Sequence, residues 1–188
     1  GRLGDFGCHY MDLAHWALNL RQPTRIETEG PEVESVTTPR YLQVDYYHPA
    51  IEKRSPVHLT WYGNRTPDIV KALKDSNGKP LNFESGQLFV GEKGMIISNY
   101  GEHRLLPEST YKEFERPDEF IPNSIGHHKE WTEAIRNGGN TTCNFDYAGA
   151  LTETVLLGSV SYRSGEDIDY IPETATTRKS GKARNMLH

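Results

Sequence analysis

The chain has 188 residues and a formal net charge of −5, from 26 acidic and 21 basic side chains that are mixed along its length. This length fits one domain, which can bury about 70% of the surface of the unfolded chain, and the mixed charge argues against a nucleic-acid-binding face. Two cysteines are too few for a disulfide framework, and no apolar run approaches the roughly 20 residues of a membrane-spanning helix. The 10 tyrosines, 6 phenylalanines and 3 tryptophans argue against a disordered chain.

The first twenty residues carry the candidate chemistry. Asp5, His9 and Asp12 recur at the spacing that places side chains in one stripe on a helix, and Trp16 extends this stripe. The opposite face of the predicted helix is apolar and anchors it. Because an imidazole titrates near neutrality and a nearby carboxylate favours its charged form, the spacing suits proton transfer. The alternatives are a helix cap for Asp5, a hydrogen-bonded structural role for His9, and a metal site built on all three side chains.

Period-two alternation and turn residues predict a series of strands after this helix. The predicted strands span residues 25–29, 41–47, 57–62, 87–90, 95–98, 100–106 and 167–171. Between residues 63 and 86, prolines and turn residues predict a long surface segment with one helical turn. The strand at 57–62 has two different faces. One carries Val57, Leu59 and Trp61, and the other carries His58, Thr60 and Tyr62.

Two further helices are predicted at residues 124–137 and 146–164. Gly138 and Gly165 follow their last residues, as expected of left-handed C-terminal caps. Asp146 is expected to cap the start of the second of these helices.

His127 and His128 lie in the first turn of the helix at 124–137. A helix dipole disfavours positive charge near its N-terminus, so this position favours neutral imidazoles that accept a proton or a sugar hydroxyl. Capping or surface solvation is the alternative role for both side chains.

The predicted order is one helix, several strands, two helices and a last strand, without alternating strand–helix units. The sequence therefore predicts an α+β fold with an open, mostly antiparallel sheet and helices packed on one of its faces. Residues 1–175 form this domain. The locally basic residues 176–188 are predicted to be a disordered tail.

The run GDFGCHYMDL at residues 4–13 closely resembles the G-D-x-G-x-H-x-x-D-L motif that opens the C-terminal domain of the glucose-fructose oxidoreductase and inositol dehydrogenase family (Gfo/Idh/MocA). Residues 57–62, 88–96 and 125–165 resemble later landmarks of a bacterial branch of that family, in the same order. The resemblance implies a substrate-binding domain that forms homo-oligomers through its open sheet face. It also implies a separate Rossmann domain that binds NAD or NADP.

By this resemblance, His9 is the catalytic base for a secondary alcohol of a sugar or polyol, and Asp5 orients it. The candidate substrate-binding residues are Asp12, Trp61, Tyr62, His127 and His128. No G-x-G-x-x-G fingerprint occurs, and Lys79-Pro80 follows glycine and so departs from the Glu-Lys-Pro motif of the family. We therefore expect a fragment of a longer protein, with no cofactor bound and no activity by itself.

Three alternatives stay open at this point: an NAD-dependent glycosidase of the same fold, a non-catalytic sugar-binding or oligomerisation module, and a metal-dependent hydrolase built on Asp5, His9 and Asp12. The expected compartment is the cytoplasm, with the periplasm as the alternative because branches of this family reach it. No nucleic-acid or membrane partner is expected. The substrate and the choice between NAD and NADP are not specified by the sequence.

Overall fold

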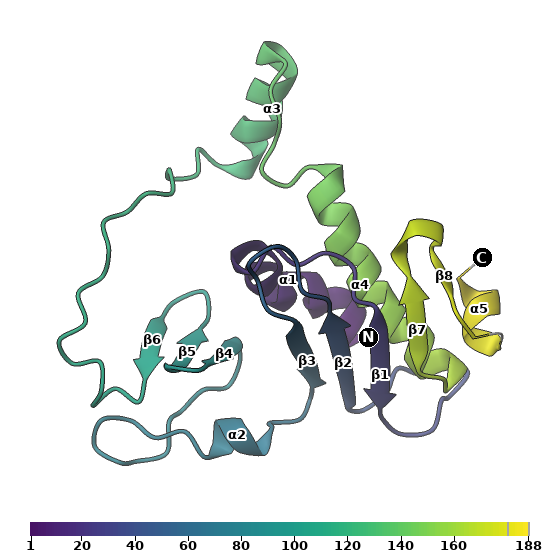
Figure 1. Ribbon diagram of the computed structural model, residues 1–188, viewed down its shortest axis with the longest axis horizontal. Coiled ribbons are helices and arrows are strands. Elements are labelled where there is room, and N and C mark those ends of the chain that lie inside the picture. The colour runs from purple at the N-terminus through teal and green to yellow at the C-terminus, as the bar shows by residue number, and fades with distance from the viewer. Residues whose placement is uncertain (180, 188) are drawn as a thin grey trace.

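The computed structural model describes residues 1–179 and 181–187 and has an α+β fold (Figure 1). Its helices are α1 (Arg2–Ala17), α2 (Asp68–Lys71), α3 (His127–Asn137), α4 (Phe145–Ser164), α5 (Lys182–Met186) and the short 3-10 helix η1 (Pro172–Thr174). Its strands are β1 (Arg25–Glu29), β2 (Leu42–His48), β3 (Val57–Gly63), β4 (Gln87–Gly91), β5 (Gly94–Ser98), β6 (His103–Leu106), β7 (Ile168–Ile171) and β8 (Thr176–Thr177). In these residues, no helix combines the length and hydropathy that a membrane crossing requires.

The strands form two open antiparallel sheets. The first has five strands in the order β3-β2-β1-β7-β8, and the second has three in the order β4-β5-β6. The predicted α+β class is confirmed, but the strands that we expected in one sheet are divided between two. The long connection through α2 separates β3 from β4, and the two sheets stand apart without pairing in the described residues (Figure 1).

The main core lies between the five-stranded sheet and the helices α1 and α4, which cover the same face of it (Figure 1). Alternation along β2 turns Val44 and Tyr46, both fully buried, toward these helices. Gly158 of α4 lies so close to the sheet that a β-carbon there would overlap the Tyr46 hydroxyl. A small residue is therefore required where this helix crosses the sheet.

The ends of α3 and α4 follow the local signals in the sequence. Gly138 and Gly165 adopt left-handed φ values of 69° and 70°, which confirms the predicted C-terminal caps. The start of α4 differs from the prediction, because the side chain of Asn144 and not that of Asp146 accepts the backbone N–H of Tyr147, at 3.1 Å. Asp146 lies in the first turn of the helix, where its charge still complements the dipole.

The C-terminal segment contains regular structure where a disordered tail was predicted. β8 pairs with β7, and Ala183 of α5 is only 2% exposed. The carboxylate of Glu166 accepts the backbone N–H groups of Lys182 and Ala183 at the start of α5. Part of the predicted tail, Ser180 and His188, lies outside the described residues.

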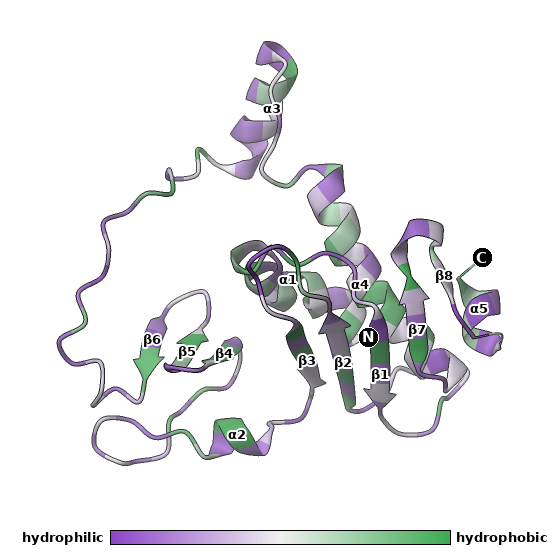
Figure 2. Cartoon of the chain, in the orientation of Figure 1, coloured by the Kyte–Doolittle hydropathy of each residue, from purple (hydrophilic) through white to green (hydrophobic). Residues whose placement is uncertain are grey.

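Helix α3 projects away from both sheets (Figure 1) and has no buried residue. It carries both hydrophobic and hydrophilic side chains (Figure 2), and Trp131 and Ile135 on it are 62% and 68% exposed. Its predicted amphipathic pattern is present, but its apolar face has no partner in the described part of the chain.

Candidate functional site

Helix α1 presents three different faces, and this division organises the candidate site. Leu3, Gly7 and Met11 face the core and are buried. Asp5 and His9 lie on an exposed face. A third row, at four-residue spacing, borders a cleft and consists of Arg2, Phe6, Tyr10, Ala14 and Leu18.

His9 is exposed, and its Nδ1 lies 3.3 Å from the hydroxyl oxygen of Tyr100. Tyr100 belongs to the connection between β5 and β6 and is 91 residues away in the sequence. The Tyr100 ring also packs near that of Tyr10, at 5.9 Å between centroids, and Phe6 lies 6.1 Å from the His9 ring. The candidate base therefore stands in a group of aromatic rings. Sequence analysis missed Tyr100, because no local signal connects this loop to α1.

Asp5 is exposed like His9, one turn earlier on the same helix. Among the described residues, no hydrogen bond joins its carboxylate to the His9 ring. The structure thus places the two predicted catalytic side chains on one face, and the polar group in contact with His9 is the Tyr100 hydroxyl.

Asp12 has a different environment from the other two polar residues of the stripe. Tyr147 of α4 donates its hydroxyl to Asp12 Oδ1 at 2.6 Å and to the Asp12 carbonyl at 3.1 Å. Burial of the phenol and its bond to the Asp12 carboxylate raise the pKa of Tyr147. This carboxylate holds α1 against α4, so its role in the described structure is to position the helix.

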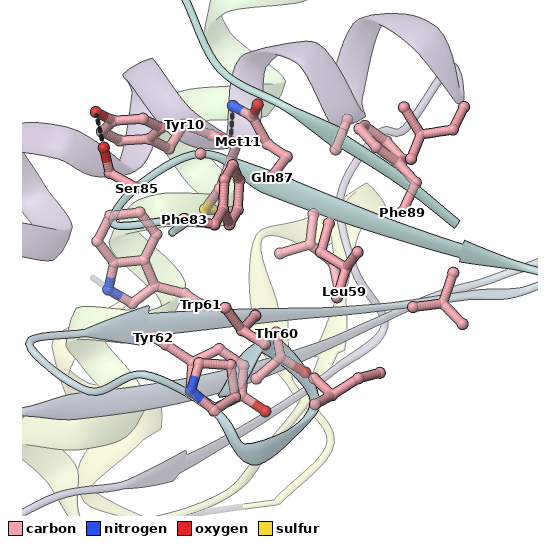
Figure 3. A pocket seen from close by; sticks show the side chains of 18 of the residues that line it. Tyr10, Met11, Leu59, Thr60, Trp61, Tyr62, Phe83, Ser85, Gln87 and Phe89 are labelled. Atoms are coloured by element: carbon pink, nitrogen blue, oxygen red, sulfur yellow. Dashed lines mark hydrogen bonds between the residues drawn. The ribbon is translucent and has the colours of Figure 1, made fainter. Parts of the chain in front are cut away.

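A cleft of about 1190 Å³ opens beside the third row of α1, between β3 and β4 (Figure 3). Several aromatic side chains line it, with Phe83 from the connection and Phe89 from β4 among them. Gln87 Nε2 donates to the Tyr10 carbonyl at 2.8 Å, and the Tyr10 hydroxyl lies 3.4 Å from Ser85 Oγ. These two contacts tie the three-stranded sheet to α1 at one end of the cleft.

Trp61 and Tyr62 both line this cleft, from opposite faces of β3 (Figure 3). Trp61 lies on the helix-covered face, is only 9% exposed, and has no hydrogen-bond partner for its Nε1 in the described residues. The resemblance to the family predicted that homo-oligomers form through the open face of the sheet. This face is polar in the structure. On it, Asp45 Oδ1 accepts bonds from His58 and Thr60, both at 2.7 Å.

His127 and His128 lie exposed in the first turn of α3, with ring centroids 4.1 Å apart. The projection of α3 keeps them away from α1 and from the cleft (Figure 1). The described structure therefore brings Tyr100, and neither of these histidines, to His9.

The described residues contain no group of three or more His, Cys, Asp or Glu side chains placed to hold a metal ion. Their sheets are antiparallel throughout and offer no strand–helix–strand crossover of the kind that cradles a dinucleotide. The described residues thus do not form a dinucleotide-binding fold by themselves. No protein-family model and no curated protein matches the chain.

Proposed function

We propose that this chain is the substrate-binding half of an NAD(P)-dependent oxidoreductase that acts on a secondary alcohol of a sugar or polyol. The observation that supports this proposal most directly is the exposed imidazole of His9 on a helix whose other side is anchored in the core. The motif at residues 4–13 provides the second support. A base held on a rigid helix and open to solvent can reach a substrate hydroxyl without any rearrangement of the core.

In this proposal Nε2 of His9 is the base, because Nδ1 is the ring nitrogen in contact with Tyr100. When Nδ1–H of His9 donates to the Tyr100 oxygen, at 3.3 Å, the lone pair on Nε2 is free. Nε2 then accepts the hydroxyl proton of the substrate. The same Nδ1–H bond strengthens once the ring is charged, because hydrogen bonds from charged donors are stronger. Tyr100 is thus a positioning residue for His9.

A nicotinamide cofactor, when bound, supplies the hydride acceptor for this reaction. Since the described residues do not form a dinucleotide-binding fold, the dinucleotide would be held mainly by residues outside them. The aromatic rings around His9 would face the apolar C–H side of a sugar ring, and the exposed carboxylate of Asp5 would accept its hydroxyl groups.

The test uses the whole protein that contains this chain, in single-turnover assays of NADH or NADPH formation. His9→Ala is expected to slow the chemical step by about 10²–10⁴-fold, the usual contribution of a positioned base, with unchanged cofactor affinity. Tyr100→Phe is expected to slow it by about fivefold, which corresponds to one neutral hydrogen bond. Trp16→Phe changes another exposed aromatic of the same helix and is the control.

Equal rates for the wild type and His9→Ala would refute the assignment of the base. If the protein cleaves glycosides without net formation of reduced cofactor, the NAD-dependent glycosidase alternative holds. If sugars bind with affinity unaffected by His9→Ala and no turnover occurs, the chain is a non-catalytic sugar-binding module.

A further inference from the structure

Residues 68–111 form a small module with a core of its own. The module contains α2 and the three-stranded sheet, and it stands apart from the five-stranded sheet (Figure 1). Its buried cluster shares no residue with the main core and consists of Leu73, Ile97 and Leu106. Within the module, the Ser76 N–H donates to Glu108 Oε2 at 2.7 Å, and the Leu81 N–H donates to the carbonyl of Leu73. The module is thus held together independently of the main core.

The module is joined to the rest of the fold by two chain connections and by one contact with α1. The connections are residues 64–67 and 112–126, and the second is exposed along its whole length. Apart from these connections, the hydrogen bonds between the module and the rest of the described chain end on His9 or Tyr10. A unit that is held by so few contacts can move at a low cost in free energy.

Both walls of the cleft carry exposed apolar side chains. On the module, three residues that line it are between 42% and 63% exposed: Ile69, Val90 and Ile96. On the opposite wall, Phe6 of α1 is 41% exposed, and β3 adds the side chains of Leu59 and Trp61 (Figure 3). In the described residues, no hydrogen bond joins β3 to the module across the cleft. Apolar surface on both walls would leave water if the walls approached, and no polar contact across the cleft would have to break.

We infer that the module is a lid, which rotates about its contact with His9 and Tyr10 and closes the cleft against β3. The structure shows the open form, with about 1190 Å³ between the two walls. Closure packs the side chains of Ile69, Val90 and Ile96 toward the opposite wall. The lid moves as one body, because its own core and internal hydrogen bonds do not depend on the cleft.

The position of the pivot has a consequence for the candidate base. Because the Tyr100 hydroxyl contacts His9 at the pivot, Tyr100 stays beside the imidazole while the lid moves. Closure removes water from the side of α1 on which Tyr10, the neighbour of His9, lines the cleft. Lids that exclude water strengthen the electrostatic interactions of an active site. This consequence rests on the proposed function, whereas the movement of the lid does not depend on it.

The test measures the distance between two nitroxide labels by pulsed electron paramagnetic resonance, in the whole protein with its native cysteines, Cys8 and Cys143 included, replaced. One label is attached at Glu92→Cys, in the exposed turn of the lid, and the other at Lys53→Cys, in the exposed turn before β3. We expect a shorter separation in addition to that of the structure. Labels at Lys53→Cys and Glu173→Cys, both outside the lid, are the control and should show one separation.

Val90→Asp places a carboxylate on the wall of the lid that closure buries. It is expected to lower the ratio of closed to open molecules by at least about tenfold, because burial of an unpaired charge is costly. Ile69→Asp makes the same change from α2 and serves if Val90→Asp does not fold. Val36→Asp is the matched control, since Val36 is 91% exposed and lies outside the cleft, and it should leave the ratio unchanged. Circular dichroism checks that the variants fold.

A single separation that is the same in the wild type and in Val90→Asp would overturn the inference, because the module would then be rigidly attached. Two separations whose ratio is unaffected by Val90→Asp would also overturn it, since the apolar wall would then not be buried by the movement. A single short separation in the wild type that lengthens in Val90→Asp would support a lid that is mostly closed. No turnover is measured, so the result stands whether or not the oxidoreductase proposal holds.

Discussion

His15 and His48 form a buried imidazole pair between the end of α1 and the end of β2, and this pair predicts how stability depends on pH. The side chains are 1% and 2% exposed, and their rings meet edge to face at 5.5 Å. Burial, together with the charge of His48 and Arg21, lowers the pKa of His15 from 6.5 to about 3. Burial is also the main cause that lowers the pKa of His48, to about 4, and Arg54 acts in the same direction.

Both imidazoles are therefore neutral in the folded protein at pH values where the unfolded chain already binds protons. Stability is fully present above pH 6.5 and is lost as the pH falls toward the folded pKa values. Each pH unit in this window costs about 1.4 kcal/mol for each histidine. Between pH 7.5 and pH 5.5 the pair is thus expected to lower the free energy of unfolding by about 3 kcal/mol, out of the 5–15 kcal/mol of a typical domain.

Urea unfolding at several pH values measures this loss. In the double variant His15→Leu/His48→Leu, the difference in unfolding free energy between pH 7.5 and 5.5 should be smaller by about 3 kcal/mol. This holds whether the two substitutions raise or lower the unfolding free energy at neutral pH. The control is His127→Leu/His128→Leu, which removes an exposed pair and should keep the wild-type difference. If the double variant without the buried pair keeps the full pH dependence, or if NMR shows both buried rings titrating near 6.5, the reasoning is refuted.

Four further substitutions test the packing. Gly158→Ala places a methyl group against a core tyrosine and should cost about 1–3 kcal/mol of unfolding free energy in chemical denaturation, whereas Gly149→Ala, in the same helix with open space around it, should stabilise by up to about 1 kcal/mol. Equal effects at the two glycines would contradict the close approach of α4. Tyr147→Phe removes the hydroxyl that donates to Asp12 and should lower the free energy of unfolding by about 1.5–3 kcal/mol. Trp131→Ala should change it by less than about 0.5 kcal/mol, and a larger loss would show that α3 packs against the body.

The amino-acid sequence by itself determined the features that depend on neighbours along the chain. The helix at α4, the hairpin of β4 and β5, and the caps at Gly138 and Gly165 follow from periodicity, turn residues and the φ values that glycine tolerates. The opposite faces of β3 also followed, because alternation needs no knowledge of the rest of the fold.

Only the tertiary structure decided the surroundings of the candidate site residues. Tyr100 reaches His9 across 91 residues, and Tyr147 reaches Asp12 across 135, so no local spacing encodes either bond. The division into two sheets and the isolation of α3 are likewise settled by long-range packing. Periodicity states which face of an element is apolar, but which partner covers that face depends on the free energy of the whole folded chain.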